Sequence, residues 1–310
     1  MKYKVLITAP YFQLVIDQYQ DIFDQNSMEI IVPRVNERMD EEELLKLVGD
    51  IDGILCGDDR ITEKVLVVAP KLKVIVKWGT GIDSINKEAA AVRGITIRNT
   101  PNAFTEPVAD TVLSFILCFA RGTIDLDEKI RRGIWEKKLN RALNDCTLGV
   151  IGVGNIGQAI IKRAQSFGMK ILGNDIKELP FDFMVPLEQL LKESDFVSLH
   201  CDLNPTSQHL IKKKTLLLMK PSAYLLNAAR GPIVDEKALI GALQKEQIAG
   251  AGLDVFEVEP LPLDHPYKKM SNVIMSPHNS NSSPSAWKRV HKNSINMLVE
   301  ELKKIKKDDV

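Results

Sequence analysis

The 310-residue sequence lacks most of the features that would assign it to a special class of protein. It has no excess of charge, because 41 basic side chains balance 41 acidic ones. No electrostatic attraction to nucleic acid or to an anionic membrane is therefore predicted. Four cysteines lie far apart without a C-x-x-C pair, at Cys56, Cys118, Cys146 and Cys201. This spacing argues against a metal site or a disulfide framework and is typical of a reducing cytoplasm.

Long hydrophobic runs are also missing. The longest, VADTVLSFILCFA, has about 13 residues and contains Asp110. A membrane span needs about 20 apolar residues, so we expect a buried helix here and no membrane partner. The first residues, MKYKVLITAP, enter a strand-like run at once and leave no room for a signal peptide. We therefore expect a soluble, cytoplasmic protein.

Short strand-like runs alternate with helical patterns along the whole chain. A first series comprises KVLITA, DGILCG, LKVIVKWG and ITIRNT; a second comprises TLGVIGVG, KILGND, FVSLHC, AYLLNAA, AGLDVF and NVIMS. This alternation is typical of parallel sheets joined by crossover helices. The fold class is therefore predicted to be α/β, with two Rossmann-like or flavodoxin-like domains.

A dinucleotide-binding fingerprint opens the second series. Gly152, Gly154 and Gly157 form G-x-G-x-x-G between a strand and a helix, where they allow a tight turn, approach of a pyrophosphate and close packing. Asp175 ends the next strand, 18 positions beyond Gly157. Its carboxylate would accept hydrogen bonds from the adenosine ribose and repel a 2′-phosphate, which favours NAD over NADP. Alternatively Asp175 only starts a turn, and Lys177 leaves some tolerance for NADP.

The final helical pattern, AWKRVHKNSINMLVEELKKI, is not needed by the second series, whereas the first series lacks a covering element. We expect this helix to pack on the amino-terminal domain. Residues 99–285 would then form an NAD-binding Rossmann domain. It would be inserted in a smaller substrate-binding (lid) domain made of residues 1–98 and 286–310.

Three strand-like runs near the end of the chain lead into ionisable residues: YLLNAARG into Arg230, AGLDVFEVEP into Glu259 and NVIMSPH into His278. Carboxyl ends of strands border the ligand crevice of an open α/β sheet. The cation could hold an anionic substrate, and the carboxylate could tune an imidazole acid/base. A histidine at a strand end is more often a satisfied loop residue than a catalyst. We prefer a structural role for the other four histidines: His200 in a strand on the cofactor side, His209 and His265 in loops, and His291 on the last helix.

Seven ordered segments resemble the D-isomer-specific 2-hydroxyacid dehydrogenases, the family that contains D-3-phosphoglycerate dehydrogenase. They are KWGTGIDSINKEAA, NTPNAFTEPVAD, CTLGVIGVGNIGQAI, SDFVSLHCDLNPTSQHLI, LLNAARGPIVDEKALIGAL, AGAGLDVFEVEP and MSPH. The resemblance implies an NAD-dependent oxidoreductase that interconverts a 2-keto acid and a D-2-hydroxy acid. It also implies the inserted-domain layout and a homodimer, with the helix before Gly122 and the segment RRGIWEK as contact elements.

The resemblance also gives each strand-end residue a role. Arg230 would anchor the substrate carboxylate and carbonyl, for which a planar, permanently charged guanidinium is suited. His278 would donate the proton to the carbonyl oxygen during reduction and accept it in reverse. Glu259 would hydrogen-bond the imidazole and favour its charged form. Hydride would pass between nicotinamide C4 and substrate C2.

Further contacts follow from the same resemblance. The turn Gly79, Thr80 and Gly81 would receive the substrate carboxylate on its backbone N–H groups, together with Arg230 and His278. Asn155 and Ile156 would cover the pyrophosphate, and Asp254 would accept the nicotinamide amide. Cys201 and Ala228 would line the adenosine and nicotinamide sides. The full expected cofactor set is Thr80, Gly152, Gly154, Asn155, Ile156, Gly157, Asp175, Cys201, Ala228, Arg230, Asp254 and His278.

The expected substrate pocket departs from the family pattern. The polar run Asn279–Ser283 follows His278 and would suit a hydroxylated substrate or a different hinge. In CGDDRIT, Asp58 and Asp59 place negative charge where phosphoglycerate-type enzymes carry arginines, opposed only by Arg60 or Lys77. This disfavours a phosphorylated substrate. Trp78 either narrows the pocket or belongs to the core.

Two other functions share these features. A dinucleotide-sensing corepressor of the same fold can carry the same arginine, glutamate and histidine, so these residues alone do not exclude it. A relative acting on formate or an amino acid is a second alternative. Turnover of a longer 2-keto acid would separate the dehydrogenase from both.

Overall fold

The computed structural model describes residues 2–308, and the chain divides into two compact units. Unit 1 contains the residues up to Phe104 and those from Ser283 onward, and unit 2 is Thr105–Ser282. One unit is thus inserted in the other, and the division falls within a few residues of the boundaries expected at 98/99 and 285/286.

Unit 1 is built on a parallel five-stranded sheet of order β2-β1-β3-β4-β5. Its inner strands β3 and β4 are buried along their whole length, as expected for a parallel sheet covered on both faces. This strand order is the flavodoxin-like one. The strands are β1 (Tyr3–Ile7), β2 (Met28–Ile31), β3 (Gly53–Cys56), β4 (Val74–Lys77) and β5 (Thr96–Arg98).

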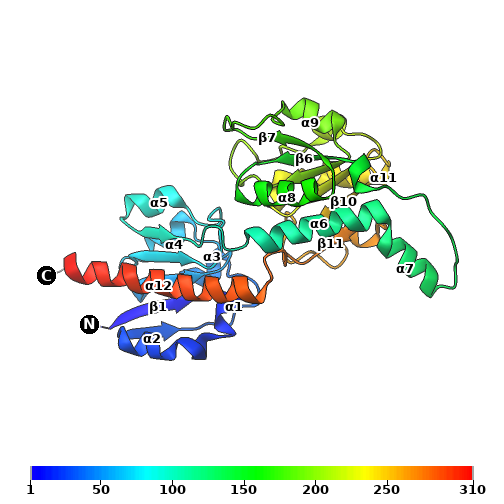
Figure 1. The fold of residues 1–310 in the computed structure, drawn as a ribbon. Helices are drawn as coiled ribbons and strands as arrows, with labels where there is room; N and C mark the ends of the chain where they lie inside the picture. Colours follow the sequence, from blue (N-terminus) through cyan, green and yellow to red (C-terminus); the bar gives the residue numbers. More distant parts are fainter. Residues whose placement is uncertain (1, 309–310) are drawn as a thin grey trace. The chain divides into compact units, whose positions relative to one another are not determined.

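Helices cover unit 1, and α12 (Pro284–Asp308) packs along β3 and β4 (Figure 1). The Arg98–Glu301 ion pair of 2.6 Å joins β5 to α12. Placement of the last helix on the amino-terminal domain therefore agrees with the prediction. The other helices are α1 (Pro10–Gln13), α2 (Gln20–Gln25), α3 (Glu41–Leu45), α4 (Glu63–Val67) and α5 (Lys87–Val92), with the 3₁₀ turns η1 (Ile16–Tyr19) and η2 (Val48–Asp50).

Unit 2 holds a parallel six-stranded sheet of order β11-β10-β9-β8-β6-β7. A bridge between Gly173 and Met184 adds a short parallel segment beside β7. With that segment included, the strand order is that of a dinucleotide-binding sheet. All strands stay parallel, but the order in which successive strands are added reverses between β6 and β8. The strands are β6 (Thr147–Ile151), β7 (Lys170–Asn174), β8 (Phe196–Leu199), β9 (Tyr224–Asn227), β10 (Gly250–Leu253) and β11 (Val273–Met275).

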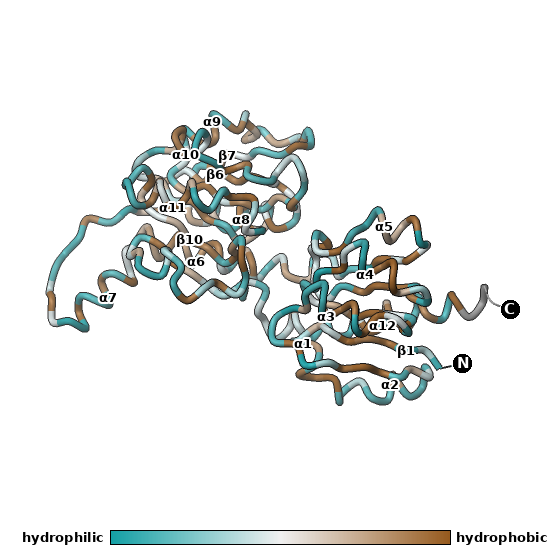
Figure 2. Tube along the Cα trace, turned by 180° about the vertical axis from the view of Figure 1, so that it is seen from behind, coloured by the Kyte–Doolittle hydropathy of each residue, from teal (hydrophilic) through white to brown (hydrophobic). Residues whose placement is uncertain are grey.

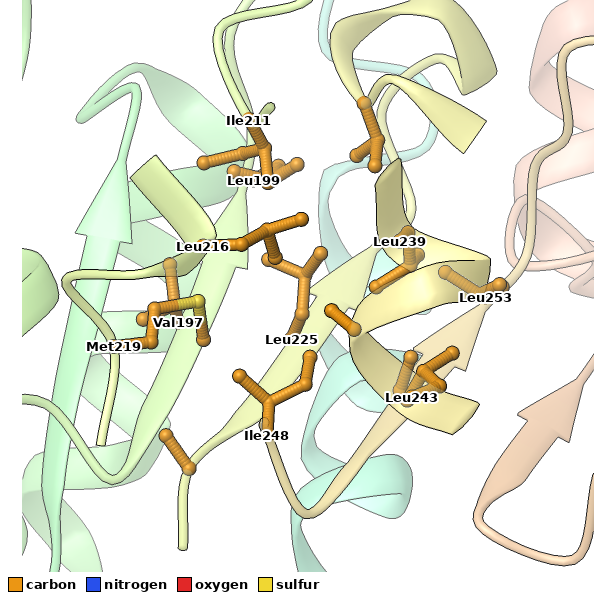
Figure 3. Close-up of a cluster of buried hydrophobic side chains, with 14 of the residues drawn as sticks. Val197, Leu199, Ile211, Leu216, Met219, Leu225, Leu239, Leu243, Ile248 and Leu253 are labelled. Atoms are coloured by element: carbon orange, nitrogen blue, oxygen red, sulfur yellow. The ribbon is translucent and has the colours of Figure 1, made fainter. Parts of the chain in front are cut away.

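Two helical layers enclose this sheet. On one face, side chains of β8, β9 and β10 interlock with those of α9, α10 and α11 in an aliphatic core (Figure 3). On the other face, α6 and α8 pack together, α8 against β6 and β7 and α6 against β9. The helices are α6 (Thr105–Arg121), α7 (Thr123–Arg131), α8 (Asn155–Ser166), α9 (Leu187–Glu193), α10 (Lys213–Leu216) and α11 (Glu236–Gln244), with the 3₁₀ turns η3 (Leu143–Asp145), η4 (Gly231–Ile233) and η5 (Pro266–Lys269).

The predicted α/β class with two parallel sheets is confirmed. All ten predicted strands are present, whereas the short edge strand β2 was not predicted. The predicted apolar helix is α6, which buries one side in the core of unit 2. Within residues 2–308 no single helix is long and apolar enough to cross a membrane, and α6 and α7 reach that length only together, across a bend of 59°.

Candidate active site

The three predicted catalytic residues all lie in unit 2, after three neighbouring strands. Arg230 follows β9, Glu259 follows β10 and His278 follows β11. These strands are adjacent and parallel, so their carboxyl ends meet at one edge of the sheet. In open α/β sheets this edge is where ligands bind.

His278 and Glu259 form the imidazole–carboxylate pair that the sequence predicted. His278 Nδ1 lies 2.9 Å from Glu259 Oε2, and about a fifth of each side chain is exposed. A carboxylate only accepts, so Nδ1 carries the proton of this hydrogen bond and Nε2 is the nitrogen for exchange with a substrate. The other oxygen, Glu259 Oε1, accepts the backbone N–H of Phe256 at 2.9 Å. Both oxygens of the carboxylate are thereby held.

Asp254 fixes the turn that carries His278. The carboxylate is buried, and its two oxygens accept the backbone N–H groups of Asn279 and Ser280 at 2.9 and 3.0 Å. The backbone N–H of His278 also donates to Asp254 O at 2.7 Å. These contacts hold His278 at φ +50°, a left-handed conformation that non-glycine residues adopt only when their surroundings enforce it. The nicotinamide contact expected of Asp254 stays a prediction.

Asn227 and Gly231 position Arg230. The Asn227 side chain accepts the N–H of Ala229 at 3.1 Å and donates to Arg230 O at 2.9 Å. A Cβ atom added to Gly231 would collide with the Phe256 backbone, so only glycine lets this turn pack against the turn that carries Glu259. The sequence interpretation missed both residues, although a glycine directly after the arginine was a usable signal.

The fingerprint glycines have the geometry expected of a dinucleotide turn. Gly152 has φ +91°, and an added Cβ atom would lie 2.5 Å from Cys201 N. A Cβ atom on Gly157 would collide with Gly152 O, whereas one on Gly154 would meet nothing within 4 Å. Helix α8 begins at Asn155, with Ile156 as its second residue, so the amino terminus of the helix and its partial positive charge face the turn. These residues fit a bound pyrophosphate.

Asp175 lies beside that turn, directly after β7. Its Oδ2 accepts the N–H of Val153 at 2.7 Å, and its Oδ1 accepts the N–H of Lys177 at 2.9 Å. The carboxylate therefore starts a local turn and also borders the glycine-rich loop. Its role in the turn does not exclude a hydrogen bond with the adenosine ribose, and that contact stays a prediction.

Two further residues near the fingerprint are uncharged near neutral pH. Burial lowers the pKa of His200 to about 4 and raises the pKa of the Cys201 thiol to about 11. His200 Nε2 pairs with Ser198 Oγ at 2.8 Å, while its buried Nδ1 has no hydrogen-bond partner among the described residues. Ala228 is partly buried beside the core of the sheet. None of these residues is set up for acid/base or nucleophilic chemistry.

The predicted carboxylate loop lies in unit 1, after β4. Gly79 has φ +140°, and its carbonyl accepts Thr100 N at 2.9 Å and Thr100 Oγ1 at 3.0 Å. Thr80 is exposed and its hydroxyl donates to Thr100 O at 3.2 Å. The end of β5 therefore holds the first two residues of the Gly79–Gly81 turn.

The charge expected of CGDDRIT differs in the structure. Asp58 pairs with the buried Lys77 ammonium at 2.5 Å. Asp59 is fully buried and accepts Thr8 Oγ1 and Met39 N, both at 2.6 Å, and burial raises its pKa. Asp59 is thus part of the fold, and Lys77 offsets Asp58. A phosphorylated substrate would therefore meet less negative charge at this segment than the sequence indicated.

Trp78 belongs to the core. It is 5% exposed, packs against Tyr11, Phe104 and Trp287, and donates from Nε1 to His291 Nδ1 at 3.0 Å. Burial lowers the pKa of His291, which suits a neutral imidazole that accepts this hydrogen bond. Of the two interpretations offered for Trp78, the core position is correct.

Comparison with known proteins identifies the family. A family model described as "D-isomer specific 2-hydroxyacid dehydrogenase, NAD binding domain" matches residues 113–280. The glyoxylate reductase of Thermofilum pendens is 40% identical over 276 residues, which cover 84% of this chain and 81% of that protein. The D-3-phosphoglycerate dehydrogenase of Methanocaldococcus jannaschii is 35% identical over 312 residues, which cover 97% of this chain and 57% of that longer protein.

Solved structures agree. The D-lactate dehydrogenase of Aquifex aeolicus, complexed with NAD and lactic acid, superposes with a TM-score of 0.88 at 28% identity, covering 97% of this chain and 95% of that one. These matches do not favour the corepressor alternative. The chain belongs to the D-isomer specific 2-hydroxyacid dehydrogenase family and is an NAD-dependent oxidoreductase that interconverts a 2-keto acid and a D-2-hydroxy acid.

Proposed function

We propose that this enzyme reduces a small 2-keto acid with Arg230, Glu259 and His278 as its catalytic residues. The observation that carries this proposal is the 2.9 Å hydrogen bond between His278 Nδ1 and Glu259 Oε2 at the carboxyl edge of the sheet. The strained, fully anchored backbone of His278 supports it, because such strain tends to be kept where function needs it.

The proposed reaction divides the work among the three side chains. NADH, when bound at the glycine turn, supplies the hydride that adds to substrate C2. Arg230 holds the substrate carboxylate and the carbonyl oxygen and offsets the negative charge that develops on that oxygen. His278 gives its Nε2 proton to the same oxygen, which completes the hydroxyl group. Glu259 stabilises the imidazolium before the transfer.

Glyoxylate is the first candidate substrate. The relative from Thermofilum pendens that shares 40% identity is named a glyoxylate reductase. Phosphorylated acids stay in consideration, because Lys77 pairs with Asp58 and Asp59 is buried. The polar run after His278 would suit a hydroxylated acid or a different hinge, so hydroxypyruvate is included among the candidates.

NAD is the proposed cofactor in preference to NADP. The Asp175 carboxylate borders the glycine turn through its hydrogen bond with Val153 N. A 2′-phosphate placed against this carboxylate would be repelled, whereas the ribose hydroxyls of NAD would donate to it.

The test is oxidation of NADH and NADPH with glyoxylate, pyruvate, hydroxypyruvate, phosphohydroxypyruvate and phenylpyruvate. We expect turnover of at least one small acid, a preference for NADH, and D-products from the prochiral substrates. Arg230→Lys keeps the charge but loses the planar fork, so its KM should rise. Tight NADH binding without reduction of any acid would contradict the proposal, and an L-product would contradict the assigned stereochemistry.

We also propose that the enzyme is a homodimer. Helix α6, which precedes Gly122, would contribute to its contact. We add α7 and the segment after it, which include RRGIWEK. In Figure 1 these residues project from the rest of unit 2, and Figure 2 shows hydrophobic stretches among their hydrophilic ones. Four large apolar side chains there are between 46% and 98% exposed: Ile130, Ile134, Trp135 and Leu139. Such exposure on an extended arm favours burial against a second copy.

A cytoplasmic setting remains part of the proposal. All four cysteines are free in the structure, including the buried Cys56 and Cys146. Free thiols are typical of reducing compartments. Fractionation of the producing cells would test this point, and recovery outside the cytoplasm would contradict it.

A further inference from the structure

The turns that carry Arg230 and Glu259 pack directly against each other. Gly231 packs so closely on the backbone of Phe256 and Glu257 that no side chain fits between them. Glu259 in turn accepts the N–H of Phe256, which closes its own turn. A shift of either turn would therefore move the other.

A third segment, residues 209–211, lies beside the turn that carries Arg230. His209 N donates to Pro232 O at 2.9 Å and Ile211 N donates to Ile233 O at 3.1 Å. Asp235 N returns a hydrogen bond of 2.8 Å to Ile211 O. The backbone of this segment is therefore hydrogen-bonded to the residues directly after Arg230.

The side chain of His209 reaches the other turn. Its Nε2 lies 3.4 Å from Glu257 Oε1. The same oxygen accepts the N–H of Glu236, the first residue of α11, at 3.2 Å. Glu257 thus meets both His209 and the amino terminus of a nine-residue helix, where negative charge is favoured.

The backbone of His209 is strained in the same way as that of His278. Its φ is +49°, again in the left-handed region. A non-glycine residue stays there when surrounding contacts enforce it. The hydrogen bond to Pro232 and the contact with Glu257 are such contacts, and they tie His209 to both turns.

We propose that His209 and Glu257 are positioning residues that clamp the Glu259 turn against the Arg230 turn. The inference rests on the proposed catalytic roles and deepens them. His209 holds the arginine turn through its backbone and the glutamate turn through its imidazole. Neither residue is assigned a contact with substrate or cofactor; both act through Glu259, whose carboxylate sets the orientation of His278.

The clamp predicts a catalytic effect without a large effect on stability. The two side chains are 45% and 33% exposed, and contacts between such exposed polar side chains contribute little to the free energy of unfolding. A small displacement of a positioned catalytic group, in contrast, can lower a rate substantially. Catalytic and structural roles can therefore be separated by experiment.

The test compares His209→Ala, His209→Gln, Glu257→Ala and Glu257→Gln with the unmodified enzyme in the reductive direction. Glu188→Gln, which removes another exposed ion-paired carboxylate of unit 2, is the matched control. We expect kcat to fall about tenfold in both alanine variants, with a smaller change in KM. His209→Gln should restore part of the rate, because a glutamine amide is a hydrogen-bond donor that can take the place of the imidazole beside Glu257.

Thermal unfolding separates positioning from a loss of folded enzyme. The alanine variants should unfold at nearly the same temperature as the unmodified enzyme while their kcat falls. A loss of folded protein would instead lower the unfolding temperature together with the rate.

Two results would overturn the inference. Alanine variants with unchanged kcat, in an enzyme that His278→Ala inactivates, would remove the clamp and leave the proposed function standing. Failure of the unmodified enzyme to reduce any 2-keto acid would remove the proposed function and the clamp together.

Discussion

His278 is held through both its imidazole and its backbone, although it lies in a loop. Glu259 binds its Nδ1, Asp254 O accepts its backbone N–H, and the Asp254 carboxylate binds the next two N–H groups. A general acid must meet its substrate within hydrogen-bond reach. This anchoring supplies the rigidity that such a role requires.

His200 gives a pH-dependent prediction at the residue scale. Burial lowers its pKa to about 4, whereas the unfolded chain binds the proton near the ordinary value of about 6.5. The folded state is therefore fully favoured above about pH 6.5 and loses stability as the pH falls toward 4, since the unfolded chain binds the proton first.

His200→Gln removes this titration and keeps a polar group opposite Ser198. Between pH 7 and pH 4.5 the variant should lose less free energy of unfolding than the unmodified protein, by on the order of 2 kcal/mol. Urea unfolding at both pH values measures the difference. Equal losses in the two proteins would show that His200 does not titrate in this way.

The positions of single residues were predictable where they depend on a strand end, and less so where they depend on tertiary contacts. Arg230, Glu259 and His278 could be placed at one edge of the sheet because each follows an apolar run. Their catalytic roles stay predictions. The roles of Asp59 and Trp78 could not be decided, because burial is not visible in the sequence. The same limit hid the contact of His209 with Glu257, which are 48 positions apart.

At the scale of elements, continuous apolar runs made the sheet predictable. The inner strands of both units are buried on both faces, so nearly every residue in them is apolar. Strand β2 was missed because it is a four-residue edge strand with only Met28 buried. Helix α7 has no buried residue and therefore no apolar face to reveal it in a charged stretch.

The turns between elements carry the function, and glycine marks the closest approaches. Gly152 and Gly157 allow β6, β8 and α8 to meet at the fingerprint, and this was predictable from the motif. Gly231 allows a similarly close approach between the turns that carry Arg230 and Glu259, but it belongs to no motif with a known geometry. Its importance became visible only with the neighbouring backbone of Phe256.

At the scale of the whole molecule, the insertion of one unit in the other was predicted from a single helix, the last one. The last helix was amphipathic and unused by the second strand series, and the structure has it in unit 1. The assignment of cofactor and substrate to the two units stays a prediction.

The proposed dimer gives a prediction at this scale. Replacement of Trp135 and Leu139 together by aspartate should convert the dimer to a monomer, because charge would enter the apolar contact. Light scattering coupled to size-exclusion chromatography measures the mass. Leu263→Asp is the matched control, since Leu263 is 94% exposed elsewhere in unit 2 and should leave the dimer intact. A monomeric unmodified protein would contradict the proposal.

The proposed role of His278 is to transfer a proton to the carbonyl oxygen while hydride is delivered to the 2-keto acid. Turnover of His278→Ala with NADH and the best acid, measured beside the affinity of the variant for NADH, tests this role. We predict a loss of about 10²–10⁴-fold in kcat, the usual weight of general acid catalysis, with NADH binding largely retained. An unchanged rate in this variant would remove His278 from the mechanism.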